Sequence, residues 1–359
     1  MTERKIFLRP AALLTAVLLL LGGLTGCGGK GTAGRYEIQY VDLFDTVTTL
    51  IAYADDRASF DRWAADVHAA LLEYHRLYDI YNEYEGVTNL CLVNRKAAKA
   101  PVTVDSRILG LLEMGKQAGE ETGGKVNVAF GAVLSIWKAY REEGSADPAN
   151  AVLPSRESLR EAAEHIDPAD IVIDWDASTV FLADPLLKID VGAVGKGYAA
   201  EQVARQMTER AEEYGVSSAL LNLGGNIRAV GGRADGTPWR VGIQDPKRAE
   251  TGGLLMRVGL DGGEALVTSG DYQRYYTVDG KRYAHIIDPD TLTPPEYVSS
   301  VSVLCPDSGR ADALSTALFL MPAEQGRMLV ESLPDVEAVW VEKDGTVTYS
   351  AGFEARILR

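Results

Sequence analysis

The residues best suited to chemistry begin with a glycine-rich stretch, Asp190 to Gly197, which reads DVGAVGKG. An apolar run at 186–189 precedes it and predicts a strand, and apolar residues every three or four positions predict a helix over 195–214. Glycines let a backbone approach a ligand, and a helix N-terminus offers unpaired N–H groups and a partial positive charge. Phosphate suits such a place, with Lys196 adding positive charge and Asp190 a carboxylate for a polar group or a metal. The alternative is a tight turn that binds nothing.

Two common phosphate-binding motifs do not match this stretch. A Walker A loop needs glycine where Asp190 stands and Ser or Thr where Gly197 stands. A dinucleotide fingerprint reads G-x-G-x-x-G, whereas the glycines here read G-x-x-G-x-G. A phosphate site in this chain therefore belongs to another fold.

A second candidate is the stretch from Ala311 to Thr316, which we expect to open a helix. Asp312 and Thr316 are four residues apart and share one helical face. A carboxylate, a hydroxyl and nearby carbonyls are hard oxygen ligands, which suit Mg²⁺. Zinc is disfavoured because it prefers Cys and His, and the chain has four scattered His.

Three further stretches combine an apolar strand or loop with polar residues at a turn. Taken singly, each is also explained by an ordinary turn or helix cap. They are 221–226 (LNLGGN), 268–272 (TSGDY) and 285–289 (HIIDP).

The elements that must position these residues are strands and helices of ordinary length. Long helices are expected from Phe60 to Tyr78 and around 108–115, with shorter ones at 155–165, 310–320 and 323–332; 79–94 and 142–154 are expected to be loops. The fold class is α+β: one mixed domain with a mostly antiparallel sheet and helices packed on it. The expected strands are 36–43, 46–53, 171–174, 179–182, 186–189, 218–223, 226–230, 239–243, 254–260, 264–268, 274–278, 298–304 and a hairpin at 336–350.

The first residues predict export. Basic residues precede an apolar run at 11–24, too short to span a bilayer, so 1–26 is expected to be a signal peptide. Its end, LTGC, is similar to a bacterial lipobox with Cys27 as the lipidated residue; a plain signal peptide is the alternative. Residues 27–35 would form a flexible tether and 36–359 the folded domain, held at the extracytoplasmic face of the cell membrane by the lipid.

Composition narrows the choice of partners and of redox chemistry. The net charge is −15 and no Lys/Arg stripe occurs, so nucleic acid is not an expected partner. Cys91 and Cys305 are the other cysteines, and either a disulfide or two thiols fits them equally well.

Taken together, these stretches resemble the ApbE family of FAD:protein FMN transferases. The resemblance covers about Phe44 to Phe319, in the family's order of motifs. The matching motifs are D-x-G-A-x-G-K-G, N-x-G-G-N, W-x-x-G-I-x-D-P at 239–246, S-G-D-Y, H-I-I-D-P and A-D-A-x-x-T. It implies transfer of FMN from FAD to a Thr or Ser hydroxyl of an acceptor protein, with Mg²⁺ as cofactor and AMP as product.

The resemblance also implies a role for particular residues. The metal would be bound by carbonyls of Ala193 and Ser315 and by the side chains of Asp312 and Thr316. The proton acceptor would be His285, with Asp288 second, because the unperturbed pKa of histidine is near neutral. FAD would be bound by Phe44, Tyr81, Lys125, Val126, Asn127, Asp190, Lys196 and Ile286.

The sequence departs from the family pattern in two places. The first motif usually reads M-G-T, and here it is Phe44-Asp45-Thr46. The histidine motif is usually followed by T-G, and here Leu292 follows Thr291. The first departure puts the flavin contact at Phe44 in question. The second puts the shape of the loop after the histidine motif in question.

Other functions fit parts of the same pattern. Water in place of the acceptor hydroxyl would make the protein an FAD pyrophosphatase, releasing FMN and AMP. A flavin-binding lipoprotein without catalysis would leave FAD intact. A solute-binding lipoprotein would show two βαβ-type lobes, which the β-rich second half disfavours. For the transferase, the resemblance points to membrane redox subunits, such as those of sodium-pumping NADH:quinone reductase and Rnf-type complexes, or to secreted FMN-binding domains.

Overall fold

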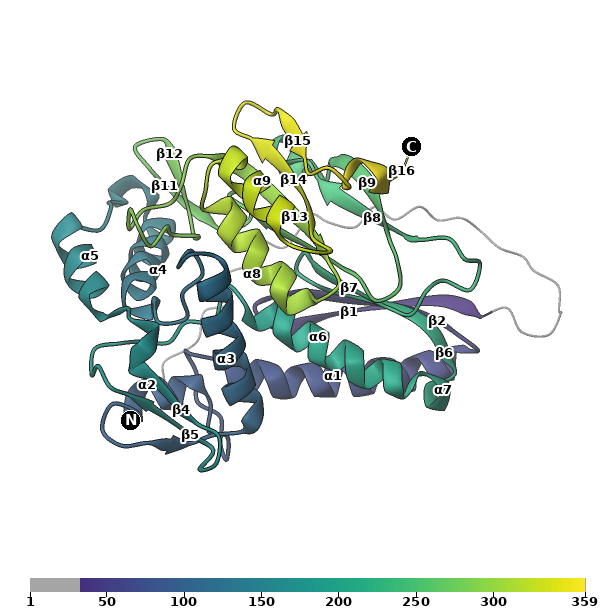
Figure 1. The fold of residues 1–359 in the computed structure, drawn as a ribbon, viewed down its shortest axis with the longest axis horizontal. Coiled ribbons are helices and arrows are strands. Elements are labelled where there is room, and N and C mark those ends of the chain that lie inside the picture. Colours follow the sequence, from purple (N-terminus) through teal and green to yellow (C-terminus); the bar gives the residue numbers. More distant parts are fainter. Residues whose placement is uncertain (1–32, 359) are drawn as a thin grey trace.

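An eight-stranded antiparallel sheet forms the centre of the molecule (Figure 1). A computed structural model describes residues 33–358. In spatial order the strands are β1 (Gly34–Leu43), β2 (Thr46–Ala54), β6 (Val216–Leu223), β7 (Asn226–Val230), β10 (Ala265–Gly270), β13 (Val298–Cys305), β14 (Glu337–Glu342) and β15 (Val347–Tyr349).

Both faces of this sheet are covered. Helices α1 (Arg57–Tyr78), α6 (Gly195–Glu209), α8 (Ser308–Phe319) and α9 (Ala323–Ser332) pack on one face. A three-stranded sheet of β8 (Trp239–Gln244), β9 (Leu254–Leu260) and β16 (Ile357–Leu358) covers the other. Alternate residues of the central strands therefore enter different cores: Val267 faces the helices and Leu266 the small sheet.

A smaller region lies beside one end of the sheet. Its helices are α2 (Leu90–Lys96), α3 (Ser106–Glu121), α4 (Gly131–Ala146) and α5 (Arg156–Ala162). Its strands are β3 (Val102–Thr103), β4 (Ile171–Asp174) and β5 (Thr179–Leu182), and a hairpin of β11 (Tyr275–Val278) and β12 (Lys281–Ala284) packs on α4. Short helix α7 (Ala211–Tyr214) follows α6; 3₁₀ turns lie at Pro148–Asn150, Ala163–His165, Pro168–Asp170, Pro246–Thr251 and Glu354–Arg356.

The α+β class and most predicted strands are confirmed, but four local predictions are wrong. The run 186–189 is not one of the strands: within the described residues only Lys188 pairs, in an isolated parallel bridge with Phe130, and the side-chain amide of Asn94 bonds both the N–H and the C=O of Ile189. The segment 79–94, expected to be a loop, ends in helix α2. Asn89 caps the N-terminus of α2, because its side chain accepts a hydrogen bond from the Leu92 N–H. The helix expected over 195–214 breaks at Arg210, and α4 extends to Ala146 into a segment expected to be a loop.

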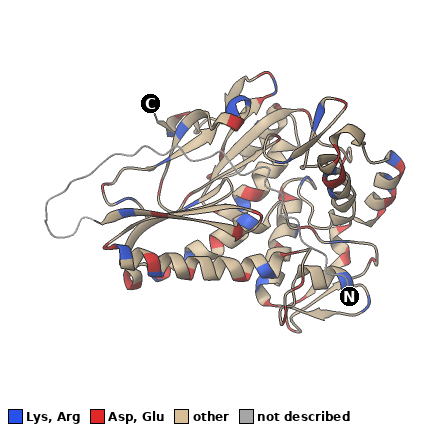
Figure 2. Cartoon of the chain, turned by 180° about the vertical axis from the view of Figure 1, so that it is seen from behind, with Lys and Arg blue, Asp and Glu red and all other residues tan. Residues whose placement is uncertain are grey.

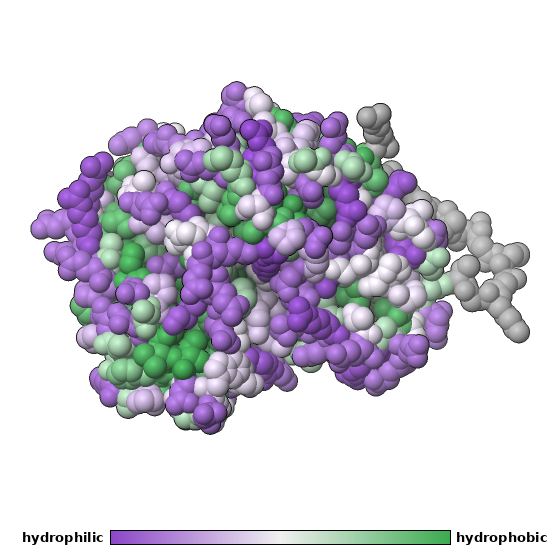
Figure 3. Space-filling view, in the orientation of Figure 1, coloured by the Kyte–Doolittle hydropathy of each residue, from purple (hydrophilic) through white to green (hydrophobic). Residues whose placement is uncertain are grey.

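The surface carries both signs of charge. Lys and Arg are interspersed with Asp and Glu over the helices and loops (Figure 2). Polar residues cover most of the face in Figure 3, with apolar residues gathered at the lower left, over the part of the chain that carries α2, β4 and β5. No helix within residues 33–358 has the length and apolarity needed to cross a membrane.

The export predictions lie mostly outside the described residues. The signal peptide at 1–26 and Cys27 fall there, and so does most of the expected tether. Strand β1 begins at Gly34, so its first two residues belong to the sheet rather than to a tether ending at 35. Cys91 and Cys305, the two cysteines in the described part of the chain, are both free thiols.

Candidate functional site

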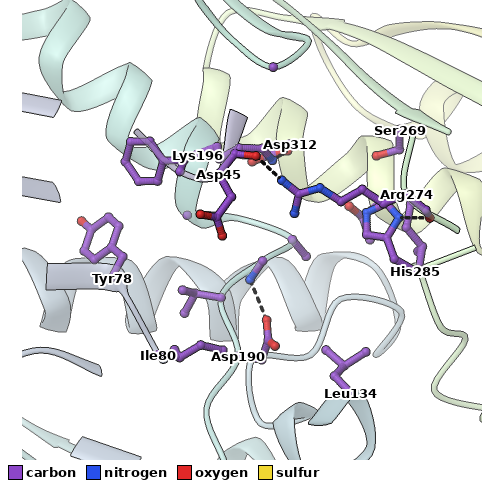
Figure 4. Close-up of a pocket in the computed structure, with 18 of the residues that line it drawn as sticks. Asp45, Tyr78, Ile80, Leu134, Asp190, Lys196, Ser269, Arg274, His285 and Asp312 are labelled. Atoms are coloured by element: carbon purple, nitrogen blue, oxygen red, sulfur yellow. Dashed lines mark hydrogen bonds and ion pairs between the residues drawn. The ribbon is translucent and has the colours of Figure 1, made fainter. Parts of the chain in front are cut away.

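A cavity of about 550 Å³ lies between the smaller region and one end of the central sheet. Its size is that of a site for an organic ligand. Sequence segments far apart meet there: the β1–β2 turn, the end of α1, the 125–127 loop, the start of α6, the end of β10, the loop after β12, and α8. Figure 4 shows Asp45, Lys196 and Asp312 on one side of this space and Ser269, Arg274 and His285 on another.

Helices α6 and α8 touch where the cavity is deepest, and glycine permits the contact. A Cβ on Gly197 would lie 2.3 Å from the Ser308 carbonyl oxygen and 2.5 Å from Asp312 Cβ. Two hydrogen bonds cross this contact. The Gly197 N–H donates to the Asp312 carboxylate (2.8 Å), and the Ser308 N–H donates to the Glu201 carboxylate (2.9 Å). Each helix thus supplies an acid to the backbone of the other.

Asp312 is the residue best placed to hold a cation. Its side chain is 5% exposed, and the Lys196 ammonium is its nearest cation, at 3.7 Å. Burial raises the pKa of Asp312, and Lys196 and the Gly197 N–H offset this only in part. A buried carboxylate whose one nearby cation lies at 3.7 Å favours a metal ion, because the ion would compensate the rest of its charge.

The other predicted metal positions can be placed around Asp312. Thr316 lies one helical turn on and lines the cavity, as does Ala193. Ser315 does not line it: its hydroxyl is buried and donates to the Asp312 carbonyl. Within residues 33–358 no group of three His, Cys, Asp or Glu side chains could hold a metal. A cation here would need hydroxyl, carbonyl and substrate oxygens, which is the pattern typical of Mg²⁺.

The turn between β1 and β2 is strained and held in place. Phe44 and Asp45 both have positive φ (52° and 51°), a conformation that usually favours glycine. The Phe44 N–H donates to His75 Nδ1 (3.1 Å), and Arg274 donates to the Asp45 carbonyl (2.7 Å). Phe44 and Asp45, which stand where the family pattern has Met-Gly, therefore form a left-handed turn, and Phe44 lies at the cavity wall.

The loop after β12 places His285 in the cavity as a neutral base. Its Nδ1 lies 3.1 Å from the Arg274 carbonyl, which can only accept, so Nδ1 carries the proton and Nε2 has a free lone pair. Burial together with the cations Arg274, Arg141 and Lys196 lowers the pKa of His285 to about 3.

Asp288, the second predicted proton acceptor, is placed differently. It is 2% exposed, does not line the cavity and accepts a hydrogen bond from Lys125 Nζ (2.8 Å), which also bonds Asp290. These contacts give Asp288 a role in holding the loop, because its carboxylate is paired with Lys125 and accepts the Asp290 N–H.

The 125–127 segment lines the cavity as predicted, but its side chains hold the loop together. The Lys125 ammonium is committed to the two aspartates. The Asn127 side chain donates to the Ile166 carbonyl and accepts from the Ala129 N–H. Val126 is buried in the core. A ligand contact from this segment would therefore come mainly from the backbone.

The remaining predicted ligand residues, Tyr81, Asp190, Lys196 and Ile286, all line the cavity. Tyr81 stands at its rim, half exposed, with the Lys138 ammonium over its ring. The Asp190 carboxylate accepts from the Gly192 N–H (2.8 Å), an arrangement that shapes the glycine turn (Figure 4).

Among the polar residues that line the cavity, sequence reasoning did not assign His75, Lys138 and Arg141 to the site. His75 lies four residues after Leu71 and three before Tyr78, both buried, and that spacing places it on the inner face of α1. Lys138 and Arg141 are three residues apart on α4, which puts both on the side that faces the cavity.

The fold and the cavity define an α+β protein with one deep site that is rimmed by cations at one side and by aromatic residues at another. Comparison with known proteins makes this specific. The sequence matches the ApbE family over residues 43–340. It is 32% identical to the FAD:protein FMN transferase of Treponema pallidum, over 95% of this chain and 94% of that one. It is 29% identical to one from Klebsiella pneumoniae, over 77% and 84%.

A solved structure of the ApbE protein from Thermotoga maritima superposes with a TM-score of 0.78 at 26% identity, covering 91% of this chain and all of that one. The ApbE flavinyl transferase of Pseudomonas stutzeri shares the fold, with a TM-score of 0.72. The chain belongs to the ApbE family.

Proposed function

We propose that this protein transfers FMN from FAD to a Thr or Ser hydroxyl of an acceptor protein. The oxygen of the acceptor hydroxyl forms a bond to the FMN-side phosphorus, the bond from that phosphorus to the bridging oxygen breaks, and AMP leaves. The observation that carries the proposal is the meeting of Asp312, Lys196 and neutral His285 around one cavity. Curated relatives named for this activity support it.

The residues present suit phosphoryl transfer, which depends on positioning and on neutralising charge around the pyrophosphate. Asp312 and Thr316, with the Ala193 carbonyl, would hold Mg²⁺, which supplies charge neutralisation at the phosphate oxygens when bound. Lys196, the first turn of α6 and Arg274 bring positive charge to the cavity.

His285 fits the role of proton acceptor. Its Nε2 lone pair is free, and the Arg274 carbonyl fixes the tautomer. A pKa of about 3 makes it a weak base in the free protein. The negative pyrophosphate would raise that pKa on binding, because it offsets the three cations that lower it.

The setting of the reaction is also part of the proposal. The lipobox-like end at Cys27 supports a lipid anchor at the extracytoplasmic face of the membrane, and the acceptor would be a membrane redox subunit or an exported FMN-binding domain.

The test is the intact mass of an FMN-acceptor domain after incubation with the protein, FAD and Mg²⁺, beside a chelator control. We expect a metal-dependent gain of one FMN. Asp312→Asn, which keeps an acceptor for the Gly197 N–H but removes the charge, should lower the rate about a hundredfold or more while the protein stays folded. Asp261→Asn, an exposed acid paired with Arg356, is the matched control and should leave the rate unchanged.

The same experiment separates the alternatives. An unmodified acceptor with free FMN in solution would favour the pyrophosphatase. An unmodified acceptor with intact FAD, for a panel of acceptor domains, would favour a flavin-binding lipoprotein. Full activity of Asp312→Asn at limiting Mg²⁺ would contradict the metal site.

A further inference from the structure

Ser269, at the end of β10, makes an unusual hydroxyl contact at the cavity wall. Residues of β10 alternate between the two faces of the sheet, and Ser269 lies on the face of Val267, toward α8. Its Oγ is 2.8 Å from the Oγ of Ser315 on α8, and Ser269 lines the cavity (Figure 4). The two serines join the sheet to the helix that carries Asp312 and Thr316.

The direction of these hydrogen bonds follows from counting hydrogens. The Ser315 hydroxyl donates to the Asp312 carbonyl (2.9 Å), which can only accept. A serine hydroxyl has one hydrogen, so Ser315 has none left for Ser269. The Ser269 hydroxyl must therefore be the donor in the contact between the two serines. Both lone pairs of the Ser269 oxygen then remain without a protein donor from residues 33–358.

An oxygen of this kind needs an electropositive partner. It has no hydrogen to offer a phosphate oxygen, so it would repel an anionic group beside it. The chain of bonds cannot conduct a proton away either, because it ends at a peptide carbonyl. Such an oxygen can accept from a hydrogen-bond donor or bind a cation, and a bound divalent cation with its water molecules supplies both kinds of partner.

We propose that Ser269 contributes its hydroxyl oxygen to the coordination sphere of the divalent cation, directly or through one bound water. The inference rests on the proposed function, since the cation is that of the transferase site. Ser315 is then a positioning residue: it fixes the hydrogen of Ser269 away from the cavity.

The test measures cation affinity rather than turnover. The melting temperature is followed against Mg²⁺ concentration at saturating FAD without acceptor, because a bound ligand stabilises the folded state as its site fills. We expect Ser269→Ala to raise the half-saturating Mg²⁺ concentration about tenfold. Ser302→Ala is the matched control. Ser302, on β13, makes a similar hydroxyl contact with Thr268, and Ser302 does not line the cavity. The half-saturating Mg²⁺ concentration of Ser302→Ala should equal that of the wild type.

Each outcome decides between roles. If Ser269→Ala lowers the melting temperature without Mg²⁺ but leaves the half-saturating concentration unchanged, the serine only ties β10 to α8 and the proposal is wrong. In that case Asp312→Asn would still abolish the Mg²⁺ effect, and the proposed function would stand. If the wild type shows no Mg²⁺-dependent shift, both the cation site and the role of Ser269 are overturned.

Discussion

The contact of α6 with α8 at Gly197 makes a prediction that two alanine substitutions in one helix can test. An alanine Cβ at Gly197 would lie 2.3 Å from the Ser308 carbonyl oxygen and 2.5 Å from Asp312 Cβ. Neither atom is the end of a flexible side chain, so the helices would have to separate. At Gly195, two residues earlier, the nearest atom to the new Cβ is Val191 Cγ2 at 3.5 Å, an ordinary contact.

The magnitudes follow from these distances. Unstrained contacts between carbon atoms are about 3.5–4.0 Å, so Gly197→Ala requires a shift of about 1 Å between two packed helices. Overpacking of this kind costs about 1–3 kcal/mol of the free energy of unfolding. Gly195→Ala meets no such clash and gains helix propensity, so it should raise the free energy of unfolding by about 0.5–1 kcal/mol. The same substitution thus has opposite signs two residues apart.

The assay is urea unfolding of both variants and the wild type. Gly197→Ala should also weaken the Mg²⁺ effect on stability, because the Asp312 carboxylate accepts from the Gly197 N–H and must move with the helix. Equal stability of Gly197→Ala and wild type would show that α6 and α8 do not approach as closely as described. A loss of stability in Gly195→Ala as large as that in Gly197→Ala would refute the steric argument.

Two further predictions concern titratable groups. Glu201 is 2% exposed and accepts from Arg228, Arg205 and the Ser308 N–H, so Glu201→Ala should cost about 3–5 kcal/mol at pH 7 by leaving Arg228 unpaired. Burial acts to raise the pKa of Glu201, but these hydrogen bonds outweigh it and the pKa is lowered. The stabilisation is therefore present above the unfolded pKa of about 4.5 and lost as pH falls through the folded one, and urea unfolding at pH 7 and pH 4 should show a smaller difference between variant and wild type at pH 4. An unchanged difference would contradict the pairing. For His285, a folded pKa of about 3 lies below the unfolded value of about 6.5, so the free energy of unfolding should decrease as pH falls from 6.5 to 3. The decrease should be smaller in His285→Gln, which lacks this titrating group. NMR titration of the free protein should show His285 neutral from pH 5 to 8; protonation near pH 6.5 would refute the cationic surroundings assigned to it.

Much of the fold was predictable because the signals are local. The apolar stripe of α1 and the short apolar runs of β6, β10 and β13 are local sequence signals, and these elements formed close to their expected bounds. The failures have long-range causes. The run 186–189 has the composition of a strand, but Asn94, 95 residues away in sequence, bonds the backbone of Ile189, and only Lys188 pairs with another described segment, at Phe130.

The site divides in the same way. The motifs around Asp190, His285 and Asp312 predicted which segments line the cavity, and they included the lining residues Lys196 and Thr316. The direction of individual side chains was not predictable. Asp288 stands three residues from His285 but turns to Lys125, and His75 points inward from a helix whose other histidine, His68, pairs with Asp42 at the surface.

The sequence by itself determined the elements, the family and the kinds of ligand atoms that the site can offer, because residue type and short-range spacing decide these. Only the tertiary structure decided which atoms meet. Gly197 and Asp312 are 115 residues apart and form a bond that holds the carboxylate in place. Ser269 on β10 and Ser315 on α8 form a hydrogen bond between the sheet and the helix, and this contact sets the direction of the Ser269 hydroxyl hydrogen. Such facts depend on how the elements pack against one another, and no local spacing records them.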